Sequence, residues 1–151
     1  MLSGEGTYVI AEAGINHNGD LDTARRLVEE AADAGADAVK FQFWEGAELS
    51  TDEETVETLA EWEFEYDEWA QLKTAADEVG IDFFASVFDA ASVDDLLDLG
   101  APAIKIASCD VTNQPLLEKV AAQHKPVIMS TGMATMSEVA SAVETLKDEH
   151  G

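Results

Sequence analysis

The stretch Ala38-Val39-Lys40-Phe41-Gln42 decides the fold, because it sets a lysine inside a segment that otherwise has the composition of a buried strand. The stretch Ala103-Ile104-Lys105-Ile106-Ala107 repeats this pattern. Side chains alternate between the two faces of a strand, so the bulky apolar residues share one face and the small or polar residues share the other. The bulky face suits a layer of helices. The small and polar face suits the interior of a barrel that opens onto a site.

Strand-like and helix-like segments alternate along the chain. The expected strands cover residues 7–12, 37–43, 81–86, 103–107 and 126–131, and the expected helices cover residues 21–34, 66–79, 92–99, 113–123 and 135–149. Asp20 and Ser92 are expected to cap two of the helices, and Gly35 is expected to end the first. Repeated β-α units of this kind predict a parallel sheet with right-handed crossovers.

Polar residues at the ends of all the expected strands favour a (β/α)8 barrel of the TIM type over an open, doubly wound sheet. In a barrel the carboxyl ends of all strands meet at one site, whereas an open sheet binds its ligand at one switch point. A closed barrel needs eight units, and we expect about five in residues 1–151. The prediction is therefore one α/β domain that forms a partial barrel, either as the N-terminal part of a longer protein or completed by another polypeptide.

The chain is strongly acidic, with 32 Asp and Glu against 8 Lys and Arg and a formal net charge of -24. This charge argues against nucleic acid and anionic membranes as partners, because both attract basic surfaces. It predicts a halophilic-type surface whose repulsion is screened by salt. The longest connection, residues 45–65, is also acidic. It is interpreted as a solvated loop, with a lid or an inter-subunit segment as the alternative.

Two further features bear on location and redox chemistry. The sequence has no run of 18 apolar residues, and its first residues lack the basic and apolar regions of a signal peptide. We therefore expect a cytoplasmic protein. Cys109 is the single cysteine, so no intrachain disulfide can form. No histidine lies near it in the sequence to activate the thiol, and we interpret Cys109 as a spacer.

Lys40 and Lys105 are two of the few basic residues, and both lie in apolar strands, where an unpaired ammonium group is costly. They are predicted to hold an anionic ligand, either phosphate or carboxylate. The alternative is a pair of structural lysines bonded to Glu12 and to backbone carbonyls. Glu12 ends the first expected strand, where burial would favour its protonated form and suit acid/base chemistry.

Hydroxyl groups and a glycine follow the fourth and fifth expected strands, at Ser108 and in Ser130-Thr131-Gly132. Hydroxyls and backbone N–H groups at such places suit phosphate oxygens, although Ser and Thr also cap helices. The stretch Asn16-His17-Asn18 follows the first expected strand. We interpret it as turn chemistry, with His17 as a metal ligand being the alternative.

Together these motifs resemble the sialic acid synthase family, the N-acylneuraminate synthases. The matching stretches are residues 10–19, 39–43, 83–89, 104–113 and 127–133. The block Glu-Ala-Gly-Ile-Asn-His-Asn-Gly at residues 12–19 and the block Ser-Thr-Gly-Met at residues 130–133 are quite specific to that family. At residues 85–89 this chain has Ala-Ser-Val-Phe-Asp, where family members often have Ser-Thr-Pro-Phe-Asp. The acidic connection is also shorter than is usual in the family.

The resemblance implies a (β/α)8 barrel that is followed by a small antifreeze-like domain, which reaches the partner's active site in a dimer. It implies the condensation of phosphoenolpyruvate with an N-acylated hexosamine such as N-acetylmannosamine, with release of phosphate. A divalent metal, manganese or magnesium, would polarise the sugar aldehyde. In the family its histidine ligands lie on the sixth and seventh strands, so we expect no metal ligand within the five units of this chain. We also expect these five units not to include the antifreeze-like domain.

The resemblance also assigns roles to particular residues. It implies Glu12 as the catalytic acid/base, and it implies as phosphoenolpyruvate ligands Lys40, Ser86, Lys105, Ser108 and Ser130. The partners would be small-molecule substrates and either a second copy or a complementing chain. We expect no synthase turnover from the isolated chain, and the residues leave the acyl sugar open.

Two other functions remain. One is a different phosphoenolpyruvate-condensing aldolase that takes an aldose phosphate, which would need further basic residues for a second phosphate. The other is a noncatalytic half-barrel that binds phosphate or assembles with a partner.

Overall fold

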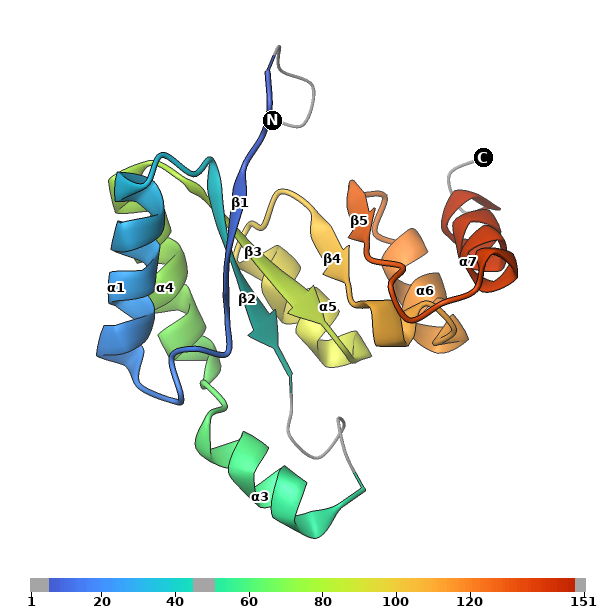
Figure 1. Cartoon of the computed structure of the whole chain (residues 1–151), viewed down its shortest axis with the longest axis horizontal. Helices are drawn as coiled ribbons and strands as arrows, with labels where there is room; N and C mark the ends of the chain where they lie inside the picture. The colour runs from blue at the N-terminus through green and yellow to red at the C-terminus, as the bar shows by residue number, and fades with distance from the viewer. Residues whose placement is uncertain (1–5, 45–50, 149–151) are drawn as a thin grey trace.

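The computed structural model describes residues 6–44 and 51–148, and Figure 1 shows a curved sheet with helices along its outer side. The strands are β1 (Ile10–Gly14), β2 (Ala38–Phe43), β3 (Asp82–Val87), β4 (Ile104–Ile106) and β5 (Val127–Met129). The helices are α1 (Leu21–Asp33), α3 (Glu53–Glu61), α4 (Tyr66–Val79), α5 (Ala90–Asp98), α6 (Gln114–Ala121) and α7 (Met136–Asp148), with a short 3-10 turn η1 (Ser108–Asp110). Strands and helices alternate as predicted, apart from the additional helix α3.

Neighbouring strands are all paired in parallel, and their order in the sheet is β1-β2-β3-β4-β5. This sequential order is what a (β/α)8 barrel requires, whereas a doubly wound sheet reverses its strand order at the switch point. The chain therefore folds as five consecutive units of a TIM-type barrel, which confirms the prediction of a partial α/β barrel. In Figure 1, α1 and α4 cover one end of the sheet, and α6 and α7 lie at the other.

Local sequence determines most of the helix ends. The Asp20 side chain accepts a hydrogen bond from the Thr23 N–H at 2.6 Å and caps α1, as predicted. Helix α4 has the predicted bounds and ends at Gly80, whose φ of 79° is left-handed. The prediction that Ser92 caps α5 is wrong. Asp89 is the cap, because its carboxylate accepts a hydrogen bond from the Ser92 N–H at 2.7 Å, and the helix begins at Ala90.

The acidic connection contains helix α3, which the sequence analysis missed. Asp52 caps it by accepting a hydrogen bond from the Thr55 N–H at 3.0 Å, and none of its residues is buried. The loop prediction is thus wrong for residues 53–61, although their exposure to solvent is confirmed; residues 45–50 lie outside the described part of the chain. The end of α3 lies against the β1–α1 loop, because a Cβ atom on Gly19 would be 2.3 Å from the Glu61 carbonyl oxygen.

On β2 and β4 the two faces carry the two kinds of side chain that the alternation predicted, whereas β3 places the bulky Phe84 on the inner face. The outer face packs its bulky residues against the helices, for example Val39, Phe41, Phe83 and Ile104. The inner face carries a smaller cluster, which consists of Ala38, Phe84 and Ala103 with Tyr8, Ile10 and Ile128 packed against them. The Tyr8 hydroxyl also donates a hydrogen bond to Asp82. The inner face therefore has an apolar floor near the amino ends of the strands, which leaves the carboxyl ends for polar groups.

Both edges of the sheet are open within the described residues, because β1 and β5 each pair on one side only. Such edges present unpaired backbone groups to another strand. No helix in this part of the chain combines the length and the hydropathy that a membrane span needs.

Candidate functional site

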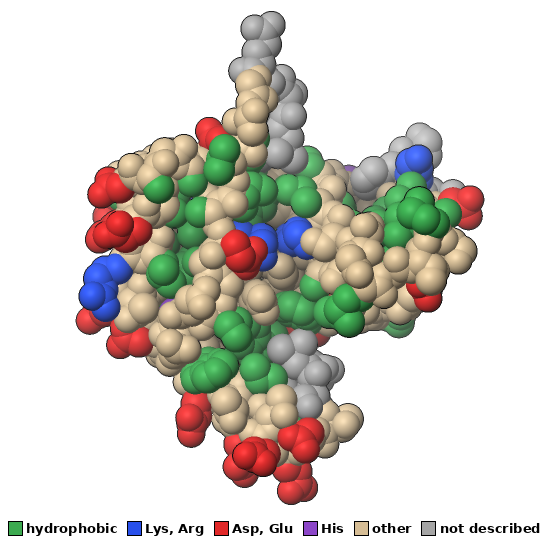
Figure 2. Space-filling view, viewed as in Figure 1, with side chains coloured by type: hydrophobic (Ala, Val, Ile, Leu, Met, Phe, Trp, Pro, Cys, Tyr) green, Lys and Arg blue, Asp and Glu red, His purple; other side chains and the backbone are tan. Residues whose placement is uncertain are grey.

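The carboxyl ends of the strands bring the predicted site residues into one hollow of about 370 Å³. Strand register sets the placement: Glu12 lies opposite Lys40, and Ser86 lies opposite both Gln42 and Lys105. The lining residues are Glu12, Gly14, Ile15, Asn16, Lys40, Gln42, Ser86, Lys105, Ala107, Ser108 and Ser130. All six residues that the sequence analysis selected are among them. Figure 2 shows basic and acidic side chains meeting near the middle of this face of the molecule.

Lys40 is the best-fixed cation of the hollow. The residue is only 9% exposed, and its Nζ atom lies 2.6 Å from Glu12 Oε2 and donates a hydrogen bond to Ser86 Oγ at 3.0 Å. The pairing of Lys40 with Glu12 that was considered as an alternative therefore exists, and it lies within the hollow. The expected burial of Glu12 is wrong, because its side chain is 53% exposed. The strand end opens toward solvent at that point, so any acid/base role of Glu12 depends on its position beside Lys40.

Lys105 is held less tightly. It is half-buried, and its ammonium group donates a hydrogen bond to its neighbour's backbone carbonyl, the Ile106 oxygen, at 2.6 Å. Burial lowers the pKa of Lys105, and the charge of Lys40 lowers it further, while the charges of Glu12 and Cys109 act in the opposite direction. Within the described part of the chain Lys105 makes no ion pair. It is thus a cation that an anionic ligand would stabilise.

Further lining residues come from loops and from strand ends, and the sequence analysis did not select all of them. Ser108 begins the η1 turn after β4, and Ser130 is exposed just beyond β5. Gln42 was recognised as a polar strand end but was not proposed for the site; its place on the same face as Lys40 is the signal that could have found it. Gly14 has a left-handed φ of 57° at an irregularity in the β1–β2 pairing. A Cβ atom there would lie 3.2 Å from Glu12 Oε1, so the small residue keeps space for that carboxylate.

His17 and Cys109 do not join the site. His17 is 1% exposed and contacts Phe41, Phe64 and Trp69, so it lies in the helix-side core and does not line the hollow. Cys109 is exposed, and its thiol donates a hydrogen bond to Asp110 Oδ2 at 3.3 Å. Burial first, then that hydrogen bond, raise the pKa of the Cys109 thiol. A raised pKa disfavours the nucleophilic thiolate, which agrees with the interpretation of Cys109 as a spacer.

The residues of the hollow do not suit a divalent metal. Among residues 6–44 and 51–148, no three His, Cys, Asp or Glu side chains are arranged to hold one. The hollow offers a single carboxylate, Glu12, which is paired with Lys40, and a second ammonium group would repel a cation. The hollow thus suits an anion better than a metal ion.

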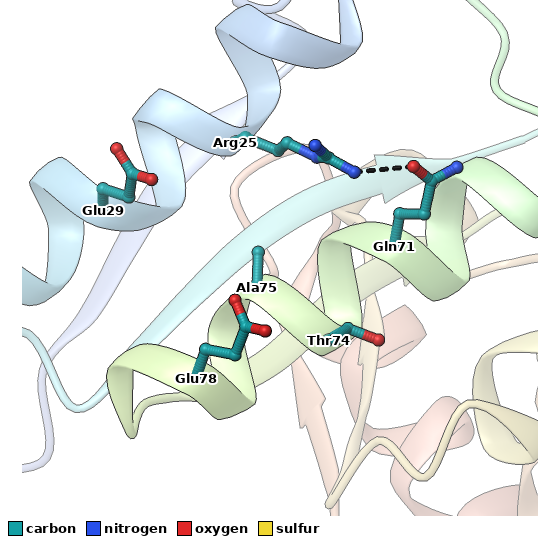
Figure 3. A pocket seen from close by; sticks show the side chains of 6 residues that line it. All are labelled: Arg25, Glu29, Gln71, Thr74, Ala75 and Glu78. Atoms are coloured by element: carbon teal, nitrogen blue, oxygen red, sulfur yellow. Dashed lines mark hydrogen bonds between the residues drawn. The ribbon is translucent and has the colours of Figure 1, made fainter.

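A second hollow of about 320 Å³ lies on the outer side of the molecule between α1 and α4 (Figure 3). Arg25 reaches from α1 and donates a hydrogen bond to Gln71 of α4 at 2.6 Å. Glu29 and Glu78 also line it, so its charges are mixed. It is a groove between packed helices, remote from the strand ends.

The fold and the first hollow define a class: a TIM-type barrel with two cationic groups and one carboxylate where the strands end. Residues 27–151 match the model of the NeuB family, and the chain belongs to that family.

Relatives and solved structures agree with this membership. The chain is 38% identical over 162 residues to the N,N'-diacetyllegionaminic acid synthase of Legionella pneumophila, a match that covers 95% of this chain and 45% of that protein. It is 40% identical to the N-acetylneuraminic acid (sialic acid) synthetase of Leptospira borgpetersenii, whose crystal structure in complex with citrate gives a TM-score of 0.93 and covers 97% of this chain and 52% of that one. The resemblance to sialic acid synthases is therefore confirmed. The chain spans about half the length of these relatives.

A more distant neighbour shares the fold. A truncated 3-deoxy-D-arabino-heptulosonate 7-phosphate synthase of Thermotoga maritima matches 97% of this chain and 49% of its own, with a TM-score of 0.71. Its sequence identity of 18% supports a common architecture and nothing about the substrate.

Proposed function

We propose that this chain supplies the phosphoenolpyruvate-binding part of a synthase that condenses phosphoenolpyruvate with an N-acylated hexosamine, such as N-acetylmannosamine, and releases phosphate. The observation that carries the proposal is the presence of Lys40 and Lys105 in one hollow, with three serine hydroxyls along its wall. Phosphoenolpyruvate carries a phosphate and a carboxylate, and two ammonium groups complement these charges. Membership of the NeuB family supports the same assignment.

Each of the six predicted residues has a part in the proposed complex. Lys40 is held in place by Glu12 and Ser86, so little side-chain entropy is lost when it contacts an anion. Lys105 would exchange its backbone carbonyl partner for the ligand. Ser108 and Ser130 lie where their hydroxyl groups can donate to phosphate oxygens.

The proposed reaction forms a carbon–carbon bond and a bond from C2 to the oxygen of water, and it breaks the bond from C2 to the phosphate oxygen; of the two protons of water, one matches the new hydroxyl and the other leaves with phosphate. C3 of phosphoenolpyruvate bonds to the aldehyde carbon of the open-chain sugar, and the aldehyde oxygen takes up a proton and becomes a hydroxyl. Water adds at C2, and the tetrahedral carbon then expels phosphate to leave a 2-keto acid. We assign Glu12 as the group that transfers a proton in this sequence. The metal that the family resemblance implies has no ligand set among the described residues, and no step is assigned to it.

Calorimetric titration of the chain tests the binding half of the proposal. At the lowest salt concentration at which the chain stays folded, we expect saturable binding of phosphoenolpyruvate. The affinity should exceed those for pyruvate and for inorganic phosphate, because each of these lacks one of the two anionic groups. If phosphoenolpyruvate fails to bind, or binds no better than phosphate, the proposed function is wrong.

A noncatalytic module that binds phosphate and assembles with a partner is the second candidate, which the two open sheet edges favour. An aldolase for an aldose phosphate is less favoured, because Lys40 and Lys105 are the basic residues that line the described hollow and a second phosphate would need more. We propose that the chain acts as a homodimer or with a complementing chain and shows no synthase turnover alone. Light scattering, together with an assay for product from N-acetylmannosamine and manganese, tests this; turnover by the isolated chain would exclude a noncatalytic module.

A further inference from the structure

The buried imidazole of His17 lies behind the wall of the hollow, in a group of aromatic rings. Its ring stacks on Phe64 at a centroid distance of 4.4 Å and meets Phe41 at 6.0 Å and Trp69 at 6.4 Å. The side chain is 1% exposed. These rings come from three places: Phe41 from β2, Trp69 from α4, and Phe64 from the turn between α3 and α4. His17 therefore connects the β1–α1 loop to all three.

The hydrogen bonds of His17 define its tautomer. The Gly19 N–H donates to His17 Nδ1 at 3.1 Å, so Nδ1 carries no proton and the neutral ring has its proton on Nε2. Nε2 is buried without a hydrogen-bond partner. Burial also lowers the pKa of His17, which keeps the ring neutral. The neutral His17 ring thus serves this loop as a hydrogen-bond acceptor for the Gly19 N–H.

The loop that His17 closes also forms the wall of the hollow. Gly14, Ile15 and Asn16 line the hollow directly. The backbone carbonyl of His17 accepts a hydrogen bond from the Asp20 N–H at 2.9 Å, which leads into α1. Gly19, the donor to the imidazole, lies against the Glu61 carbonyl at the end of α3. The β1–α1 loop thus touches the site on one side and the α3–α4 turn on the other.

We propose that His17 is a positioning residue, which fixes the β1–α1 loop, and with it one wall of the hollow, through the Gly19 N–H bond and couples this loop to the α3–α4 turn through Phe64. The sequence alone suggested only a turn residue or a metal ligand. The structure assigns a different role, because the ring faces the helix-side core while its neighbours in sequence face the ligand space. Loss of the acceptor would loosen the wall beside Glu12 without removing any group that touches the ligand.

Two variants separate this role from simple filling of the core. His17→Phe keeps an aromatic ring to stack on Phe64 but removes the acceptor for the Gly19 N–H. His17→Asn shortens the side chain but supplies an oxygen that can accept from the N–H two residues later, as in an Asx turn. Phe83→Leu is the matched control, since Phe83 contacts Phe41 and Trp69 in the same core but is remote from the loop.

Amide hydrogen exchange of residues 14–20 in the folded chain is the direct readout, and it needs no ligand. In His17→Phe, we expect exchange of the Gly19 amide to accelerate about fivefold or more, as loss of one hydrogen bond predicts. His17→Asn should restore part of the protection despite lower stability, and Phe83→Leu should leave the loop protected. Unchanged exchange in His17→Phe, or greater loosening in His17→Asn than in His17→Phe, would overturn the proposal. Should His17→Phe not fold, His17→Asn is compared with Phe83→Leu: Gly19 exchange that is faster than in wild type in His17→Asn but not in Phe83→Leu supports the proposal, and equal exchange in the two variants overturns it.

The affinity for phosphoenolpyruvate is the second readout, and this part of the inference rests on the proposed function. His17→Phe should weaken binding about fivefold, whereas Phe83→Leu should lower the melting temperature at unchanged affinity. Equal affinity of His17→Phe and wild type would contradict the coupling to the site. If the wild-type chain binds no phosphoenolpyruvate, the proposed function is wrong, while the exchange experiment still tests the positioning role by itself.

Discussion

Replacement of Lys105 by methionine should weaken ligand binding while leaving the fold intact or more stable. Methionine has a similar volume and no charge, so the change removes mainly the ammonium group. In the free protein that group is half-buried, repelled by Lys40, and, among the described residues, bonded only to the Ile106 carbonyl. The ammonium group that the substitution removes therefore stabilises a bound anion more than it stabilises the ligand-free protein.

The size of the effect follows from the kind of contact. A hydrogen bond to a charged group contributes about 1.5–3 kcal/mol, and the lower end applies because the hollow is open to solvent and Lys105 is only half-buried. Because about 1.4 kcal/mol corresponds to tenfold in affinity, phosphoenolpyruvate should bind about tenfold more weakly. The loss should shrink as salt is added, since screening weakens the contact in the wild type.

The effect on stability has the opposite sign. The pKa of Lys105 is lower in the folded chain than in the unfolded chain, so folding disfavours its charged form. At neutral pH this cost is present, and it disappears as pH rises through the ordinary lysine pKa. Removing the charge should then leave the free energy of unfolding unchanged or slightly raised at neutral pH, within about 1 kcal/mol, because one hydrogen bond is lost as well.

Titration calorimetry and urea unfolding of the same preparations measure the two effects. Lys125→Met is the matched control, because it makes the same change in net charge at an exposed position that lines a different hollow. If Lys105→Met and Lys125→Met bind phosphoenolpyruvate equally well, Lys105 is not a ligand. If Lys105→Met strongly destabilises the chain, the lysine is structural, and the reasoning about two ligand-seeking cations is wrong.

Three further predictions test the fold and its electrostatics. Gly19→Ala should destabilise the chain by about 1 kcal/mol more than Gly35→Ala. Both residues have left-handed φ, 75° and 81°, but only at Gly19 would the new Cβ meet a backbone atom, the Glu61 oxygen at 2.3 Å. Urea unfolding measures both losses of stability, and equal losses would refute the contact between α3 and the loop. The melting temperature should rise from low to molar salt, because the net charge of -24 is then screened; equal stability at both salt concentrations would count against a halophilic-type surface. Stability should fall as the pH drops below the ordinary histidine pKa of about 6.5, since burial lowers the pKa of His17 and the unfolded chain binds the proton more readily. If His17→Phe leaves the pH profile of unfolding unchanged, His17 does not contribute to it.

Much of the site could be predicted from the sequence because a strand carries its own geometry. The alternation around Lys40 placed the ammonium group and Gln42 on one face and the bulky residues on the other, and the structure confirms both faces. The pattern around Lys105 did the same for the fourth strand. The carboxyl ends of parallel strands lie on one side of a barrel, so residues at those ends could be assigned to a common site before their distances were known.

What was missed depends on contacts between segments that are remote in sequence. The exposure of Glu12 follows from how the edge strand β1 meets solvent, and strand composition does not encode this. The burial of His17 depends on Phe64, which lies 47 positions further along the chain. Helix α3 has no buried residue, and its short apolar set, Val56, Leu59 and Ala60, lies in an acidic stretch that favoured a loop interpretation.

The sequence by itself determined the succession of β-α units, most helix ends, and the two faces of β2 and β4, because these follow from backbone preferences and from side-chain periodicity over a few residues. Only the tertiary structure decided that Glu12 is exposed, that Lys40 bonds both Glu12 and Ser86, and that His17 faces the core. The physical reason is that these relations arise from the register and curvature of five strands together, which no local stretch of the chain contains.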